Sequence, residues 1–225
     1  MRYLLFALTL LCSFQSLKAQ KNINLESFNQ IQIKGNLEVT LISGEQPGMK
    51  IERGEDHRVS YEYKGGQLIV KHTELFKYKS YRDFPIQIEL TYAELRKIDV
   101  RAGAKVRAVE SIAGTRLEIH LRSGAQLKAD IQTEKVDVEV SEGAVADLSG
   151  RVNRFTGAAA SGGRMEAFEI DSEDSRVRAR TGGVVEVSAY KSLDAQANTG
   201  GHISYKGRPD QLVINDNLGG SVSRY

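Results

Sequence analysis

The sequence has no tryptophan, a single cysteine and only three prolines among its 225 residues. Cys12 lies inside an apolar run near the start of the chain, and without that run there is no thiol for a disulfide, a metal–thiolate site or a nucleophile. No later stretch has the roughly 20 consecutive apolar residues that a membrane-spanning helix needs. Few prolines beside 21 glycines favour many short strands joined by tight turns.

The segment 1–19 has the layout of a cleavable secretory signal. Arg2 precedes an apolar run over residues 4–14, and residues 16–19 read Ser-Leu-Lys-Ala. We expect the mature chain to begin at Gln20 and to be exported to the periplasm, the outer surface or the medium. The Leu-Leu pair before Cys12 lacks the small residues that lipoprotein processing needs, so Cys12 is expected to leave with the signal. The alternative is a lipid-accepting cysteine.

Removal of the signal also makes the chain neutral. It takes away Arg2 and Lys18, so that lysine plus arginine falls from 31 to 29, against 29 aspartate plus glutamate. Binding of nucleic acid depends on an excess of positive charge that neutralises phosphates. The composition therefore argues against a nucleic-acid partner.

A short sequence repeat, marked by glycines, dominates the second half of the chain. These glycines, which we expect to be structural turns, are Gly103, Gly124, Gly143, Gly162, Gly182, Gly200 and Gly219. Successive glycines are 21, 19, 19, 20, 18 and 19 positions apart. Around each glycine apolar and polar residues alternate, with apolar residues three positions after it and, apart from Gly157 and Asp216, five and three positions before it.

This pattern predicts an all-β fold, a parallel β-helix (β-solenoid) with coils of about 19 residues. Each coil has two short strands joined by a glycine-permitted bend, and stacking at roughly 4.8 Å lines the apolar columns into a core. An antiparallel barrel or sandwich would also alternate, but it gives no reason for like columns to recur at this period.

We expect a single solenoid domain over residues 20–225. Residues 95–225 hold the regular glycine-turn repeats, and residues 20–94 form irregular N-terminal coils and a cap. Strand patterns in this first part cover residues 31–41, 49–51, 59–63, 67–70 and 86–90. A separate N-terminal domain is the alternative, although no proline-rich or serine-rich linker divides the halves.

Several of these motifs together resemble a known family. They are Phe28-x-x-Ile31, the repeated Ser-Gly-Ala or Thr-Gly-Gly turns, and the stretch from Gly200 to Pro209 that reads GGHISYKGRP. The combination resembles the auto-transporter adhesin family called the head GIN domain, over essentially the whole mature chain. The resemblance implies an exported right-handed β-helix with an adhesin-like role and no catalytic residues to carry over.

The sequence offers no catalytic, cofactor-binding or metal-binding set. The histidines His57, His72, His120 and His202 are scattered, without the spacing of a metal site. Glu118, Asp137 and Glu139 are expected on adjacent coils, close enough for acid and base roles, but stacked outward charges are typical of a solvated face. We therefore predict no enzyme activity and no cofactor.

Two sets of residues are candidates for ligand binding. Arg101 and Arg122 are expected in one outward column of adjacent coils with Lys105 and Lys128 nearby, a basic patch suited to an anionic glycan. The alternative is that these charges only balance neighbouring carboxylates. In residues 75–84 the aromatic residues Phe76, Tyr78 and Tyr81 alternate with bases, and such rings can stack on sugars or bury against a partner. The alternative there is a lid packed over the end of the solenoid.

A third feature is a strip of small outward residues, Thr156, Ala158 and Ala160, where other coils carry charges. The strip predicts either a contact surface for another chain or ground covered by a neighbouring loop.

Together these features favour an exported, non-catalytic, adhesin-like binding module that presents a surface to a glycan or to another envelope protein. One alternative is an envelope component that works in structure or signalling through a protein partner, and another is a carbohydrate-active enzyme. The oligomeric state is left open.

Overall fold

The computed structural model describes residues 21–73 and 85–225. Within these residues regular structure consists of β-strands and one short 3-10 turn, η1 (Asp56–Arg58), and no helix is long and apolar enough to cross a membrane. The strands are β1 (Lys21–Asn24), β2 (Gln30–Lys34), β3 (Leu37–Ser43), β4 (Gly48–Arg53), β5 (Val59–Lys64), β6 (Gln67–His72), β7 (Ile86–Tyr92), β8 (Lys97–Arg101), β9 (Lys105–Ala108), β10 (Ile112–Leu121), β11 (Gln126–Ser141), β12 (Val145–Ala160), β13 (Arg164–Arg180), β14 (Val184–Ser188), β15 (Ser192–Asn198), β16 (His202–Lys206), β17 (Gln211–Asn217) and β18 (Ser221–Arg224).

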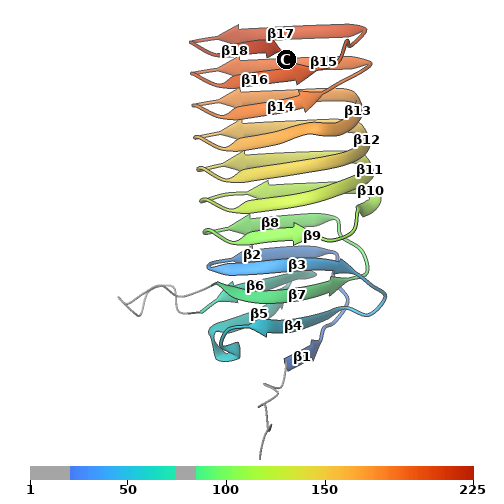
Figure 1. Cartoon of the computed structure of the whole chain (residues 1–225), viewed down its shortest axis with the longest axis vertical. Helices are drawn as coiled ribbons and strands as arrows, with labels where there is room; N and C mark the ends of the chain where they lie inside the picture. Colours follow the sequence, from blue (N-terminus) through green and yellow to red (C-terminus); the bar gives the residue numbers. More distant parts are fainter. Residues whose placement is uncertain (1–20, 74–84) are drawn as a thin grey trace, which may run out of the picture.

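From β8 onward the chain winds into a solenoid in which each coil pairs in parallel with the next (Figure 1). One ladder of directly paired residues runs through Lys105, Gln126, Val145, Arg164, Val184, His202 and Ser221. The spacings between successive residues of this ladder equal the spacings between the turn glycines, because each spacing is the length of one coil. The predicted all-β solenoid, with its ~19-residue coils, is confirmed.

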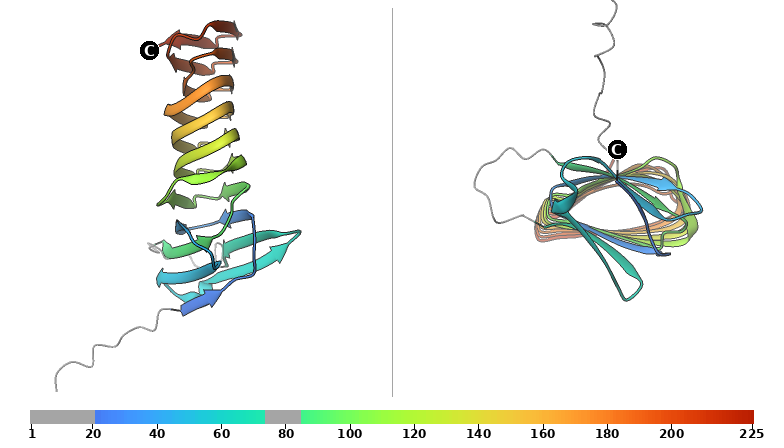
Figure 2. Two further views of the ribbon diagram at one scale, coloured as in Figure 1. Left: turned by 90° about the vertical axis from the view of Figure 1, so that its right-hand side faces the viewer. Right: turned by 90° about the horizontal axis from the view of Figure 1, so that it is seen from below.

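Each coil has two long faces that meet at the glycine turn, and the coils superimpose into a flattened oval when seen along the solenoid axis (Figure 2). We call the segments that lead into the turns the pre-turn face: β8, β15, β17 and the C-terminal halves of β10 to β13. The post-turn face consists of β9, β14, β16, β18 and the N-terminal parts of β11 to β13.

The turns between the two faces share one backbone geometry, illustrated by Ser161 and Gly162. Their φ angles are 50° and 73°, and the turn is closed by a hydrogen bond from the Gly163 N–H to the Ala160 carbonyl at 2.9 Å. Two successive residues with positive φ make a type I′ turn, whose second position glycine adopts without strain. The Gly162 N–H donates to the Thr181 carbonyl of the next coil at 3.2 Å, so the turns are also bonded along the axis.

The interior is formed by the apolar columns of the sequence. The residues three positions after the turn glycines, from Val106 to Ile203, are buried, and so are those five and three positions before them, from Ile98 to Ala197. Gly157 also lies inside, where the ring and thioether of its neighbours occupy the space that its missing side chain leaves: an added Cβ would lie 2.8 Å from Met165 Sδ and 2.9 Å from Phe155 Cε1.

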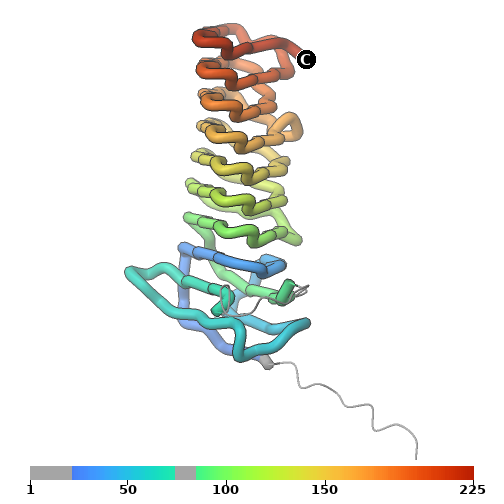
Figure 3. Tube along the Cα trace, turned by 90° about the vertical axis from the view of Figure 1, so that its left-hand side faces the viewer, coloured from blue at the N-terminus to red at the C-terminus, as the bar shows by residue number. Residues whose placement is uncertain are grey.

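The N-terminal part is irregular because the chain enters the stack in its middle. Ile31 of β2 pairs in parallel with Ile98 of β8 on one side and with Leu68 of β6 on the other. The coil of β2 and β3 therefore lies between β6/β7 and β8/β9 (Figure 3). The single strand pattern over residues 31–41 is two strands, separated by a further bend at Gly35 with φ 99°. Antiparallel strands β1, β4 and β5 complete this end of the molecule.

Candidate binding groove

The four predicted basic residues do not form one free positive patch. Arg101 and Arg122 lie on the pre-turn face of adjacent coils, whereas Lys105 and Lys128 lie on the post-turn face, beyond the glycine turns. Each has an acidic partner: the ion pairs are Arg101–Asp99, Arg122–Glu139, Lys105–Glu38 and Lys128–Asp147. Their charge is largely balanced at the surface.

Asp99 is the most buried of these acids, with 3% of its surface exposed. Burial by itself raises the pKa of its carboxyl, but hydrogen bonds from Arg101 and Gln32, together with the charges of Arg101 and His120, outweigh that effect and hold the pKa below its ordinary value. The same contact with Asp99 raises the pKa of the Arg101 guanidinium. Arg101 is therefore fixed as part of the scaffold.

The aromatic candidates Phe76, Tyr78 and Tyr81 lie outside the described residues. Their proposed role in binding stays a prediction.

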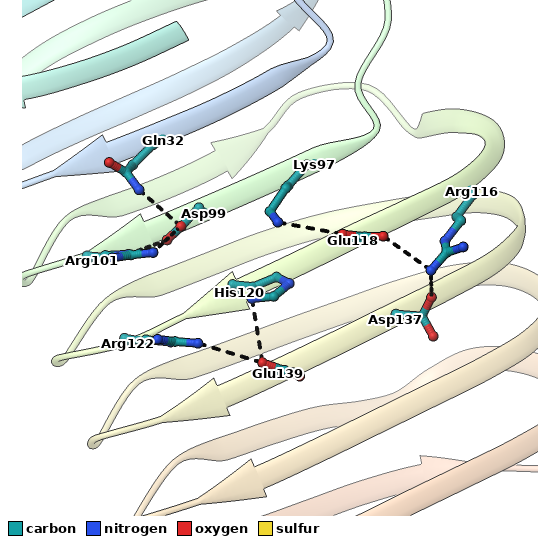
Figure 4. Close-up of polar contacts among 10 residues, drawn as sticks. All are labelled: Gln32, Lys97, Asp99, Arg101, Arg116, Glu118, His120, Arg122, Asp137 and Glu139. Atoms are coloured by element: carbon teal, nitrogen blue, oxygen red, sulfur yellow. Dashed lines mark hydrogen bonds and ion pairs between the residues drawn. The ribbon is translucent and has the colours of Figure 1, made fainter. Parts of the chain in front are cut away.

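An ionic network covers the N-terminal half of the pre-turn face (Figure 4). Arg116 contacts Glu118 at 3.2 Å and Asp137 at 3.1 Å, and Lys135 contacts Asp137 at 3.3 Å. Beside it, Glu139 lies 3.5 Å from His120 Nδ1 and 3.8 Å from Arg122. The carboxylates on this part of the face are oriented by cations from neighbouring coils.

Next to this network the pre-turn face is hollowed into a groove of about 360 Å³. Its floor is formed by Thr156, Gly157 and Ala158 of β12, with carboxylates on the preceding coil and arginines on the following coil. Strand register explains the arrangement. Asp137 pairs with Thr156, which pairs with Arg176, and in the neighbouring column Glu139, Ala158 and Arg178 follow in the same order.

Two residues of the small-residue strip, Thr156 and Ala158, thus form part of the floor of a groove. No described loop lies over it: its lining comes only from the side chains and backbone of β10 to β13. The carboxylate row on β11 and the arginine row on β13 are two coils apart, roughly 10 Å, and the small side chains of β12 leave the space between them open.

The arginine row was missed at the sequence level. Arg176, Arg178 and Arg180 are all exposed on the pre-turn face of β13. Arg176 contacts Asp194 at 3.2 Å, but Arg178 has only the neutral Gln196 oxygen, at 3.3 Å, and Arg180 forms no ion pair within the described part of the chain. The alternation Arg-Val-Arg-Ala-Arg over residues 176–180 is the sequence pattern from which this row of outward arginines could have been predicted.

A second hollow, of about 450 Å³, lies on the post-turn face and includes Lys105 and Lys128. Arg107 and three acids, Glu38, Asp147 and Glu166, complete its charged lining. Glu38 and Asp147 pair with the two lysines, so three bases face three acids and the charges of this hollow balance. No group of three or more histidine, cysteine, aspartate or glutamate residues suited to a metal ion is present in the described ranges.

The chain is similar to solved structures over nearly all its length. A "putative adhesin" of Bacteroides fragilis matches with a TM-score of 0.81 and 17% identity, covering 92% of this chain and 96% of that one. A "putative adhesin" of Parabacteroides merdae has a TM-score of 0.68 at 15% identity, covering 92% and 95%. A "putative lipid binding protein" of Parabacteroides distasonis has 0.66 at 18%, covering 92% and 96%. At these identities the likeness shows a shared fold.

No curated protein matches the chain. A family model described as "Putative auto-transporter adhesin, head GIN domain" matches residues 27–209, more than half of the sequence, and so confirms the resemblance carried by the glycine-turn motifs. The chain belongs to the head GIN domain family.

Proposed function

We propose that this protein is an exported, non-enzymatic, adhesin-like module that binds an acidic glycan in the groove of its pre-turn face. The observation that carries the proposal is the arrangement of exposed arginines and oriented carboxylates on the two sides of a floor of small residues. The adhesin description of the family and the secretory layout of residues 1–19 support the general role and the export.

The groove has complementary chemistry for such a ligand. A uronate carboxylate or a sulfate accepts paired hydrogen bonds from a guanidinium. Arg178 lines the groove, and Arg180 follows it on the same face of β13 just outside the lining. Neither arginine has an acidic partner in the described chain. Sugar hydroxyls can donate to Asp137 and Glu139 on the opposite side. Thr156 and Ala158 leave room for a ring to approach the sheet.

The same contacts suit a binding site. Asp137 and Glu139 each contact two cationic or histidine side chains, and these contacts hold the carboxylate oxygens where they can accept hydrogen bonds from a ligand.

The experiment measures binding of the purified protein to immobilised polygalacturonate, with dextran as the neutral polysaccharide. The double variant Arg178→Gln/Arg180→Gln is expected to lose at least about tenfold in affinity, since a hydrogen bond to a charged group contributes about 1.5–3 kcal/mol. Arg164→Gln is the matched control, because Arg164 is an exposed arginine of the same strand on the post-turn face. It should bind as the unchanged protein does.

Two further variants separate the groove from the patch suggested by the sequence. Ala158→Leu fills the floor without changing charge and should weaken binding, whereas Lys105→Gln/Lys128→Gln, on the post-turn face, should leave it intact. Equal binding to dextran and polygalacturonate, or loss of binding only in the Lys105/Lys128 variant, would refute the proposal for the groove.

A further inference from the structure

Three cations occupy one outward column of the pre-turn face. Arg116, Lys135 and Arg154 pair in register on β10, β11 and β12. On the first two of these strands an acid two residues later contacts the cation. Glu118 lies 3.2 Å from Arg116 (Figure 4). Asp137 lies 3.3 Å from Lys135. Each of these two cations therefore has a counter-charge on its own strand.

On β12 the corresponding acid is missing. The residue two positions after Arg154 is Thr156, and the exposed Arg154 side chain forms no ion pair or hydrogen bond with any described residue. The next outward column has a similar gap. Ala158 lies in register between Glu139 of β11 and Arg178 of β13, and the described partner of Arg178 is a neutral amide oxygen. Two arginines without an acidic partner thus flank two places where the preceding coil has carboxylates.

The space above Thr156 is open. A hollow of about 440 Å³ has Thr156 in its lining, and it shares Thr156 and Arg176 with the groove. The two hollows therefore form one trough along β12, across the axis of the solenoid (Figure 1). The basic residues around the added hollow are Lys135, Arg154 and Arg176.

The other charged residues of this added hollow have partners within the chain. Arg176 contacts Asp194 at 3.2 Å. Asp174, which is in register with Arg154, accepts a hydrogen bond at 2.6 Å from Ser192 Oγ on the coil beyond. Among the charged residues that line the hollow, Arg154 alone has no partner in the described ranges. A ligand anion above Thr156 would supply one.

We propose, on the basis of the function proposed above, that Arg154 is a second anion-binding residue and that the trough takes two acidic groups of one glycan chain. One acidic group lies above Thr156 against Arg154, and the other lies above Ala158 against Arg178. They take the places that carboxylates occupy on the preceding coil. The glycan chain then runs along β12.

The geometry also indicates the charge pattern of the ligand. Thr156 and Ala158 are alternate residues of one strand, so their Cα atoms are about 7 Å apart. This spacing fits acidic groups on neighbouring sugars of a chain, as in polygalacturonate. Binding of the second group is intramolecular once the first is held, so two linked acidic sugars should bind much more tightly than one.

The test compares galacturonate with digalacturonate in NMR chemical-shift titrations. The unchanged protein should bind digalacturonate at least about tenfold more tightly, since the second sugar adds hydrogen bonds between charged groups. In Arg154→Gln the two saccharides should bind alike. Arg151→Gln is the matched control and should keep the preference, because Arg151 is an exposed arginine of the same strand that pairs with Asp171 outside the trough.

A second pair of variants tests the missing acid. Thr156→Asp provides Arg154 with a carboxylate two residues later, as Glu118 does for Arg116, and should remove the preference for digalacturonate without lowering the melting temperature. Thr156→Asn introduces a side chain of the same size without charge and should keep the preference. The comparison separates occupation of the anion position by charge from simple filling of the trough.

The outcomes distinguish the second anion position from the groove itself. Equal affinities of galacturonate and digalacturonate for the unchanged protein, or a preference that persists in Arg154→Gln, would overturn the second position. So would equal effects of Thr156→Asp and Thr156→Asn. The proposed function would survive any of these results if Arg178→Gln/Arg180→Gln still weakens binding of polygalacturonate. Absence of binding of all three saccharides to the unchanged protein would overturn both.

Discussion

Arg101 donates two hydrogen bonds to the carboxylate of Asp99, two residues earlier in β8, from Nε at 2.7 Å and from Nη2 at 2.5 Å. The same carboxylate accepts a hydrogen bond from Gln32 Nε2 of β2 at 3.1 Å. Asp99 thus connects the regular coils to the N-terminal part of the stack. Arg101, which the sequence presents as part of a ligand-binding column, thus orients the carboxylate that bonds two coils together.

Stability should therefore fall in acid, in part through Asp99. Its carboxyl has a pKa lower in the folded chain than its unfolded value of about 3.9. Its contribution is complete above the unfolded pKa and is lost as the pH falls through the folded pKa. Urea unfolding between about pH 2 and 7 should show Asp99→Asn less stable at neutral pH, by about 1–3 kcal/mol, and less sensitive to acid.

The control for this prediction is Asp171→Asn, whose ion pair with Arg151 is exposed. It should cost less than about 1 kcal/mol. An Asp99→Asn chain with the same acid sensitivity as the unchanged protein would contradict the role of this carboxylate.

Two adjacent glycines should respond differently to alanine. Gly182 has φ +71° and open space around an added Cβ, so Gly182→Ala should cost only backbone strain, about 1–2 kcal/mol. At Gly183 a Cβ would lie 2.3 Å from the Ala159 carbonyl oxygen, so the strands must separate and Gly183→Ala should cost more. Thermal unfolding of both variants measures the difference, and equal losses would refute it.

The side chains next to Gly157 leave no room for a larger residue, so a substitution there should be tolerated better when a neighbour is made smaller. An added Cβ meets the Met165 sulfur at 2.8 Å, so Gly157→Ala should destabilise the chain by about 1–3 kcal/mol. Met165→Val in the same chain should recover part of this loss. A double-mutant cycle on unfolding free energies measures the coupling, and simple additivity of the two changes would be the contrary result.

Replacement of one turn residue should make the folded protein more stable. Thr181 has φ +50°, a region that is costly for a β-branched side chain and easier for asparagine. Thr181→Asn should raise the free energy of unfolding by up to about 1 kcal/mol, and the melting temperature with it. Thr156→Asn lies outside any turn and should not be stabilising; a fall in stability of Thr181→Asn would show that the turn does not tolerate the exchange.

Much of the fold could be predicted from the sequence because it repeats locally. The glycine spacing gives the coil length, and period-two alternation decides on which side of a strand each residue points. Val106, Ile119 and Val138 could be assigned to the core on this basis, and they are buried. The turn motifs were also specific enough to indicate the family.

The candidate site was predicted only in part. Alternation placed Thr156 and Ala158 outward, but a strip of small residues becomes a groove only through what stands on the coils beside it. Arg178 and Glu139 are far apart in the sequence, and they flank Ala158 because both pair in register with β12.

The sequence by itself determined the period, the core columns and the turns, since these depend on the conformation of a few consecutive residues. Only the tertiary structure decided which charges neutralise one another and which stay free. Asp99 is held by Gln32, 67 positions away, because β8 stacks on β2, and the last coil exposes Leu212 and Ile214 because no described strand follows it in the stack. Neighbours across coils are set by stacking order and register, which single-strand patterns do not contain.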